Sequence, residues 1–265
     1  MILSHETIFK CIRTNNNFFV VHSLKHFDCE SHSDENGDSI LTNILKYGTL
    51  EMLNYYTFKI GFGKLDDSDC HGVHNLFYVI ERKDIGFDAL RSFLVHYNGD
   101  FNLTSRMYGS LLFHSIFHRN INAIRLLISF GVDVNVTDSR GNPVIFYCVV
   151  NGLLEISNML INAPGFDVDK PNNSEESILE VSILKNMSIH SNILLQKHPI
   201  DLRCINQIKK LIHMCIDSKS TVLAWKLYQN YAACVIQSHY KRMLYFKRLS
   251  LQNGVNAIPD STNAV

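Results

Sequence analysis

The sequence predicts an all-α solenoid of about five to six stacked helix pairs, followed by a C-terminal helical extension. Apolar residues recur at helical spacing in pairs of short segments, with a glycine or an asparagine between them. The pattern also repeats along the chain, because Asp100, Asp133, Asp167 and Asp201 are 33, 34 and 34 residues apart. With 265 residues, 46% of them hydrophobic, the chain is long enough for one or two folded domains.

The unit that begins at Gly109 shows the pattern most clearly. Its first predicted helix has apolar residues at Leu112 and Ile116, and its second at Ile124 and Leu127. A glycine and an extended polar stretch follow the second helix. Each unit is therefore expected to contribute two short helices and an outward loop.

Turn residues mark the same units. An Asp-x-x-Gly sequence opens three of them, at 34–37, 69–72 and 138–141. Eleven residues after that glycine a turn between the two helices is expected, and this place holds Gly48, Asn120, Gly152 and Asn186. Glycine and asparagine both tolerate left-handed backbone angles, which suits such a turn.

These features resemble the ankyrin repeat. The Thr-Pro-Leu-His sequence typical of that family is reduced here, since the apolar third position remains in four units but only His114 keeps the histidine. The other helical-pair solenoids are the alternative fold. Complete units are predicted at 34–67, 69–103, 105–136, 138–170 and 172–202, after a partial unit, so the resemblance covers about residues 5–202. It implies a surface that binds a partner protein and no catalytic pocket.

Neither a membrane-spanning helix nor a secretory signal peptide is expected. The longest strictly apolar run is Val144–Val150, far shorter than the roughly 20 residues that a spanning helix needs. The N-terminal sequence has neither the basic region nor the cleavage site of a signal peptide. Seven cysteines, an odd number, are spread along the chain, which favours reduced thiols and a cytoplasmic location.

No catalytic residues, metal site or cofactor is expected. Cys70, His71 and His74 are close in sequence, but they lack a second ligand pair at zinc-finger spacing and are expected as exposed loop residues. No protease signature flanks a cysteine, and Cys148 is expected to be buried. Gly61 and Gly63 form only an incomplete nucleotide-binding pattern.

Charge is distributed unevenly along a chain whose net charge is zero. Up to Leu202 there are 16 basic and 23 acidic residues, whereas 203–250 contain nine basic residues and one acidic residue. A basic C-terminal segment of this kind can attract an acidic partner or the acidic part of its own chain. It begins with a predicted helix that is expected to cap the last repeat, with an apolar face at Ile208, Leu211, Ile212, Cys215 and Ile216.

The rest of the basic segment contains a second motif. Between Thr221 and Gln252 no proline or glycine interrupts the sequence, so a long helix is plausible. Ile236 and Gln237 start a pattern that resembles the IQ motif of calmodulin-binding helices. Lys241 matches its first basic place and Leu249 its final apolar place.

Two positions depart from the IQ pattern. Arg242 stands in the place of its glycine, and Phe246 in the place of its second basic residue. The apolar stripe and its basic flanks are still those that an acidic, methionine-lined EF-hand groove accepts. The predicted calmodulin-binding residues are Ile236, Gln237, Tyr240, Lys241, Arg242, Met243, Leu244, Lys247, Arg248 and Leu249. The alternatives are docking on the acidic body, or contact with a membrane surface or nucleic acid.

The sequence thus predicts an ankyrin-repeat domain over 1–202, a capping helix and an IQ-type basic helix over 203–250, and a flexible tail over 251–265. This combination resembles ankyrin–IQ adaptors such as inversin, which implies cytoplasmic, cytoskeletal or ciliary proteins. The expected function is a non-catalytic adaptor or scaffold. Its repeats would bind a partner protein, and its IQ helix would bind calmodulin or a related EF-hand light chain. The alternative is a plain scaffold with a structural basic helix.

Overall fold

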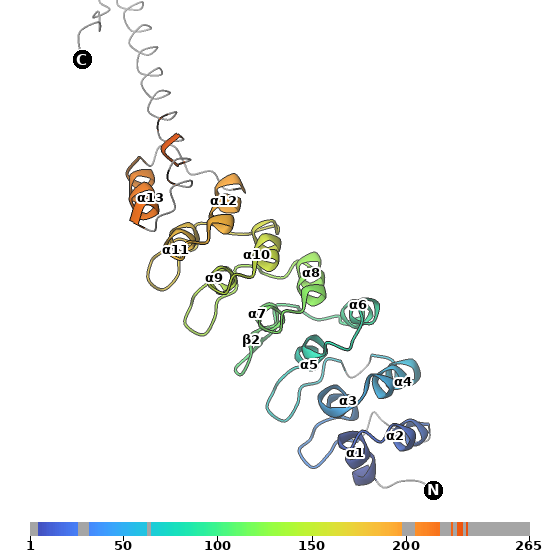
Figure 1. Ribbon diagram of the computed structural model, residues 1–265. Helices are drawn as coiled ribbons and strands as arrows, with labels where there is room; N and C mark the ends of the chain where they lie inside the picture. Colours follow the sequence, from blue (N-terminus) through green and yellow to red (C-terminus); the bar gives the residue numbers. More distant parts are fainter. Residues whose placement is uncertain are drawn as a thin grey trace, which may run out of the picture. The chain divides into compact units, whose positions relative to one another are not determined.

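The computed structural model describes residues 5–25, 32–62, 65–197 and 205–217, together with 224, 227–229 and 232 (Figure 1). Contacts within the chain divide it into two compact units, Met1–Glu176 and Ser177–Val265. Both units are helical, as predicted. Among the described residues, none of the helices combines the length and the apolar composition needed to span a bilayer.

The described residues of the first unit form five consecutive helix pairs (Figure 1). The first helix of each pair packs on its counterpart in the next pair from α1 to α7, and these inner helices carry the long loops. The second helices lie on the other side of the unit. The pairs are α1 (His5–Arg13) and α2 (Asn17–Leu24), α3 (Ile40–Tyr47) and α4 (Leu50–Ile60), α5 (Asn75–Glu81) and α6 (Phe87–His96), α7 (Leu111–Phe117) and α8 (Ile121–Ser129), and α9 (Val144–Val150) and α10 (Leu154–Ile161).

Serine side chains cap two of the inner helices. The hydroxyl groups of Ser39 and Ser110 accept hydrogen bonds from the backbone N–H groups of Thr42 and Phe113. These bonds satisfy donors that have no partner inside the helix. At α5 the cap is His74, whose Nδ1 accepts from the Leu76 N–H at 3.2 Å.

The predicted Asp-x-x-Gly sequences form the tips of the loops. Asp69 shows the arrangement: its Oδ1 accepts from the N–H groups of His71 and Val73, at 2.9 and 2.8 Å. Gly72 follows with a φ of +74°, which an L side chain rarely adopts. A pair of antiparallel strands, β1 (Thr104–Ser105) and β2 (Gly109–Ser110), forms the corresponding loop before α7.

The turns between paired helices agree only in part with the sequence prediction. Gly152 and Asn186 have the expected left-handed conformation. In the α7–α8 turn this conformation falls on Arg119, and Asn120 instead caps α8 by accepting from the Ala123 N–H. Gly48 has a φ of −79°, so its role is spatial: a Cβ there would lie 2.9 Å from the Ile44 carbonyl oxygen.

The core of the first unit is a continuous apolar layer between its two rows of helices. The inner helices contribute fully buried leucines and isoleucines such as Ile44 and Leu112, and the outer helices contribute residues such as Leu53 and Leu127. Burial of this kind, repeated in every pair, supplies most of the stability of a repeat stack. Phe18 of α2, in contrast, is 76% exposed.

The second unit contains α11 (Ile178–Leu184), α12 (Ser188–Lys197) and α13 (Ile205–Asp217). The predicted capping helix is α13, which packs against α11. Its Leu211 and Cys215 are buried together with Ile183 and Leu195, whereas Ile216, assigned to the same face by its spacing, is 58% exposed.

Candidate functional site

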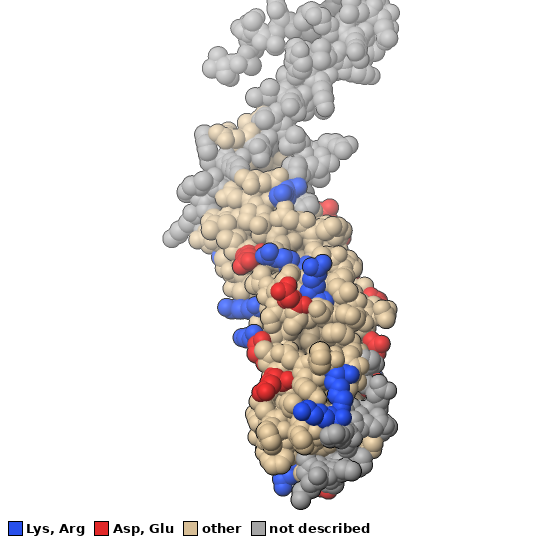
Figure 2. Space-filling model, turned by 90° about the vertical axis from the view of Figure 1, so that its right-hand side faces the viewer, with Lys and Arg blue, Asp and Glu red and all other residues tan. Residues whose placement is uncertain are grey.

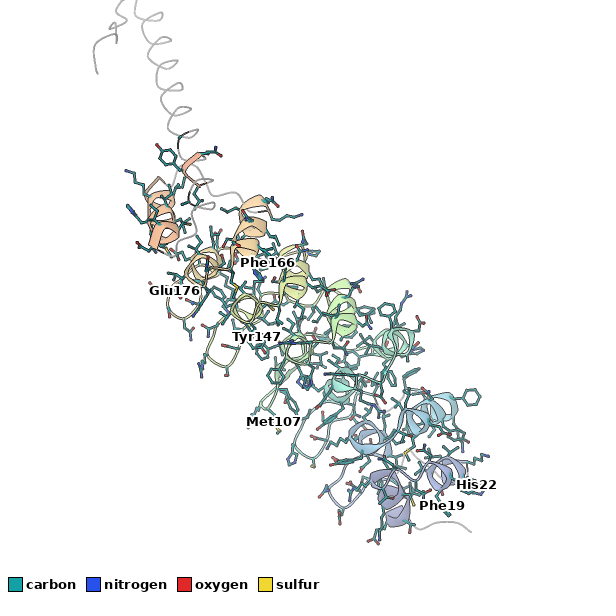
Figure 3. All side chains as sticks on the ribbon, in the orientation of Figure 1. Phe19, His22, Met107, Tyr147, Phe166 and Glu176 are labelled. Carbon is teal, nitrogen blue, oxygen red and sulfur yellow. The ribbon has the colours of Figure 1, made fainter. Side chains whose placement is uncertain are left out.

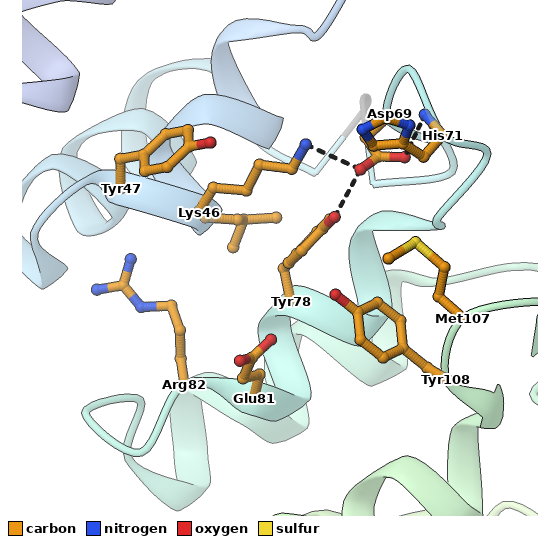
Figure 4. A pocket seen from close by; sticks show the side chains of 10 residues that line it. Lys46, Tyr47, Asp69, His71, Tyr78, Glu81, Arg82, Met107 and Tyr108 are labelled. Atoms are coloured by element: carbon orange, nitrogen blue, oxygen red, sulfur yellow. Dashed lines mark hydrogen bonds and ion pairs between the residues drawn. The ribbon is translucent and has the colours of Figure 1, made fainter.

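A groove lies on the inner helices of the first unit. It has a volume of about 460 Å³ and lies between the ends of α3 and α5 and the β1–β2 loop. Figure 4 shows that polar and aromatic side chains from three successive repeats point into it. The lining residues are Leu45, Lys46, Tyr47, Asp69, His71, Tyr78, Glu81, Arg82, Met107 and Tyr108.

An ion cluster at one end of the groove, which we call the Lys46 cluster, joins two repeats. Lys46 Nζ lies 2.7 Å from Asp38 Oδ2. Figure 4 shows its second ion pair, with Asp69 Oδ2 at 2.8 Å, and the Tyr78 hydroxyl, which donates to Asp69 Oδ2 at 2.6 Å. The side chains of Lys46, Asp38 and Asp69 are 12%, 5% and 1% exposed. Because α3 supplies the ammonium and the next repeat supplies Asp69, the cluster connects neighbouring repeats.

The Lys46 cluster keeps its charges at neutral pH. Burial by itself would raise the pKa of Asp69, but hydrogen bonds from Lys46 and Tyr78 and from backbone N–H groups outweigh it and lower the pKa to about 2. Burial and the Asp69 carboxylate both raise the pKa of Tyr78. Tyr78 therefore remains a neutral hydrogen-bond donor, and the cluster has no proton to exchange near pH 7.

Arg82, at the other side of the groove, closes the end of a neighbouring helix. Its Nη1 donates to the carbonyl oxygens of Ile44 and Gly48, at 3.0 and 2.9 Å, and its Nε donates to Asp84 Oδ1. The last carbonyl groups of α3 have no intrahelical partners, so a guanidinium group from the next repeat satisfies them. Both positively charged side chains of the groove are thus held by the protein itself.

The groove also presents apolar and aromatic surface to a partner. Met107, at the end of the β1–β2 loop, is 64% exposed and lies on the loop side of the unit (Figure 3). Tyr47, the last residue of α3, is 51% exposed. Exposed methionine and tyrosine side chains are typical anchors of protein interfaces.

The opposite side of the first unit is less distinctive. Figure 2 shows basic and acidic side chains interspersed over a mostly uncharged surface, without a large area of one sign. Phe58 on α4 is 89% exposed there, but single exposed hydrophobic residues are common on protein surfaces. The described residues therefore favour the inner helices as the binding surface.

The cysteines and histidines discussed in the sequence analysis have different structural roles. Cys70 and His71 are exposed loop residues, as predicted, whereas His74 is the partly buried N-cap of α5. Cys148 is fully buried, as predicted, and burial raises the pKa of its thiol to about 12. A thiol that remains protonated at neutral pH is a poor nucleophile.

The predicted calmodulin-binding residues, from Ile236 to Leu249, lie outside the described residues. They stay a sequence prediction. The groove, in contrast, was not predicted residue by residue, because its members come from positions about one repeat apart. The repeat register could have suggested it, since Lys46 and Glu81 occupy the same place in successive units.

Residues 76–172 match the family model of ankyrin repeats in three copies. The chain is 33% identical over 51 residues to a protein of Acanthamoeba polyphaga mimivirus described as an ankyrin repeat protein, and 35% identical over 86 residues to one of Fowlpox virus (strain NVSL). These stretches cover 19% and 32% of this chain, and 7% and 18% of the viral proteins. The similarity to these relatives is thus confined to a small part of each.

Solved ankyrin structures share the fold at low sequence identity. The ankyrin repeat domain of Bcl-3 superimposes with a TM-score of 0.57 and 15% identity, over 72% of this chain and 85% of that one. EF0377, an ankyrin repeat protein, gives 0.60 and 17%, and an ankyrin repeat domain from Acinetobacter baumannii AYE gives 0.58 and 16%; each match covers 73% of this chain and 98% of the other. The helix pairs thus share the fold of ankyrin repeat structures, and those within 76–172 match the ankyrin repeat family model.

Proposed function

We propose that this protein is a non-catalytic adaptor that binds one protein through the inner-helix groove and an EF-hand protein of the calmodulin type through its basic C-terminal segment. The observation that supports the first half is the groove itself, a concave surface lined by Tyr47, Met107 and Tyr108. Contacts of Lys46 with Asp69 and of Arg82 with the end of α3 join neighbouring repeats there. A preorganised surface of this kind loses little conformational entropy when it binds.

The partner of the groove is expected to be a folded or extended protein segment with mixed polarity. Lys46 and Arg82 have their charges compensated within the groove, which leaves the exposed carboxylate of Glu81 and the aromatic rims for the partner. A basic or aromatic side chain of the partner would complement this lining.

Substitutions on opposite faces test the groove. Met107→Asp should weaken partner capture at least tenfold in cross-linking and quantitative pull-down, because it places a charge at the apolar rim. Phe58→Asp on α4 is the matched control, since Phe58 is also exposed but lies on an outer helix. Equal loss in both variants would contradict the assignment of the groove.

The support for the second half comes from the sequence between Thr221 and Ser250. Its apolar stripe, IQ-type start and flanking basic residues are features that a semi-open EF-hand lobe binds. The alternative is that the basic segment is structural or lies on a membrane surface.

Titration of the full chain with calmodulin, with and without calcium, tests the second half. We expect binding that persists at least partly without calcium. Ile236→Asp should abolish it, because an unpaired charge in the apolar contact costs several kcal/mol. Replacing Lys247 and Arg248 by glutamine should instead slow association and reduce its salt dependence. The reverse pattern would indicate a merely electrostatic contact.

A further inference from the structure

The inner helices bring together three side chains with metal-ligating atoms. Glu81 is the last residue of α5, and His114 and His118 are one helical turn apart at α7 and its C-cap. One carboxylate oxygen and one ring nitrogen from each histidine all lie within 4.8 Å of one another. We propose that these three residues bind a divalent transition metal ion, with zinc as the best match, between two neighbouring repeats.

The donor set fits zinc chemically. Two imidazoles and one carboxylate form a known three-ligand zinc set that leaves a fourth position for water or another ligand. Two histidines four residues apart on one helix present their rings on the same face. The ring centroids of His114 and His118 are 4.4 Å apart with an angle of 53° between the rings, so both rings occupy this face together.

The deepest ligand is already held in place. His114 is 2% exposed, and aromatic contacts with Phe77 and Tyr108 fix its ring at centroid distances of 5.4 and 4.7 Å. Its Nε2 is buried and has no hydrogen-bond partner, which is costly for a polar atom.

The other two ligands can adjust to the metal. Zinc bonds of about 2.0–2.2 Å place tetrahedral ligand atoms roughly 3.4 Å apart. Glu81 is exposed and His118 is only partly buried, so rotation of their side chains can close the remaining gap while His114 stays fixed. The bound ion would link α5 to α7, and its open position would lie beside the groove that Glu81 lines.

A second cluster of potential ligands shows the contrast. Asp38, Asp69 and Cys70 also bring one ligand atom each within 4.8 Å. There the Lys46 ammonium group already sits between both carboxylates, so the negative charge is compensated. Cys70 is exposed, and desolvation and Asp38 raise the pKa of its thiol, which disfavours the thiolate that binds zinc.

Metal titration of the full chain tests the proposal. Metal-free protein is titrated with Zn²⁺ by calorimetry, and with Co²⁺ by absorption spectroscopy at pH 7.5 under reducing conditions. We expect one saturable site per chain, a visible cobalt spectrum of low-symmetry type without the intense thiolate band, and a higher Tm with zinc. Glu81→Gln and His118→Ala should each weaken binding at least tenfold and remove most of the Tm increase.

The choice of variants keeps the proposal open to refutation. His114→Ala removes a buried ring that packs in the core, so its failure to fold would be uninformative, and the two more accessible ligands carry the test. His71→Ala and Cys70→Ser serve as controls from the neighbouring loop and should leave affinity unchanged. The proposal is overturned if zinc does not saturate, if Glu81→Gln and His118→Ala bind normally, or if a control variant abolishes binding.

Discussion

At the scale of single residues, the Lys46 cluster shows how one buried cation can join two repeats. Its ammonium group compensates the charges of two buried carboxylates, which would otherwise repel each other. Position 46 lies near the end of α3, where Val150 stands in the α9 repeat, so nothing in a single repeat identifies it as an ion-pair site. The pairing becomes visible only when successive repeats stack.

Removing the cation should destabilise the first unit. Lys46→Met leaves Asp38 and Asp69 buried and unpaired, which is expected to lower the free energy of unfolding by about 3–5 kcal/mol at pH 7. The double substitution Lys46→Met with Asp69→Asn should recover part of this loss, because only one buried carboxylate remains. Urea denaturation at pH 7 measures both. A loss below about 1 kcal/mol in Lys46→Met would mean that the cluster contributes little.

The same cluster predicts how stability responds to acid. The pKa of Asp69 falls from an ordinary value of 3.8 to about 2 on folding. A lowered carboxyl pKa adds to the free energy of unfolding by at most roughly 2 kcal/mol here. This contribution is fully present above about pH 3.8 and is lost as the pH falls through about 2. Denaturation curves between pH 5 and pH 2 should therefore converge for the native protein and Asp69→Asn. Curves that stay parallel would exclude this linkage.

At the scale of the elements, the backbone of the turn between α7 and α8 is strained, whereas the equivalent turn between α9 and α10 is not. Arg119 has a φ of +54°, whereas the α9–α10 turn has Gly152 with a φ of +66°. An L side chain in this conformation costs about 1–2 kcal/mol relative to glycine. Arg119→Gly should thus stabilise the protein by up to about 1 kcal/mol, after the entropy cost of glycine in the unfolded chain.

An identical substitution inside a helix gives the control. Arg125 lies within α8 and is exposed, so Arg125→Gly should destabilise by about 1 kcal/mol. Thermal unfolding of both variants compares them directly. If Arg119→Gly lowers the Tm as much as Arg125→Gly does, the turn is not strained.

Elements were more predictable from sequence than the contacts between them. The Asp-x-x-Gly tips and the helix pairs follow from turn chemistry and helical periodicity, which are local. The left-handed residue at Arg119 was assigned to Asn120 because propensity favours asparagine there, but asparagine is also a good N-cap and takes that role. The exposure of Phe18 and Ile216 depends on which neighbour lies nearby, and periodicity carries no such information.

The candidate sites also differ in how far they can be predicted from the sequence. The IQ-type segment is a linear motif, so the sequence suffices to propose it. The groove and the proposed metal ligands are assembled from different repeats, with Glu81 33 residues before His114. Spacing near the repeat length is the only sequence signal that links such residues, and it links every residue of one repeat to the next.

At the scale of the whole molecule, the division into two compact units predicts that a destabilising substitution in one unit causes only local unfolding. Each repeat contacts mainly its neighbours, so the loss of one contact need not spread along the chain. Leu211 of α13 is 1% exposed and packs with Ile183 and Leu195. Leu211→Asp places a charge in this core, which costs several kcal/mol when the charge has no partner.

Hydrogen exchange followed by mass spectrometry should show this localisation. In Leu211→Asp we expect amide exchange at least tenfold faster in α11 and α12, with exchange in α1–α4 unchanged. Ile216→Asp is the matched control, because it adds the same charge to the same helix at a side chain that is 58% exposed, and it should leave both regions as they are. Uniform acceleration from α1 to α12 in Leu211→Asp would show instead that the chain unfolds as one cooperative body.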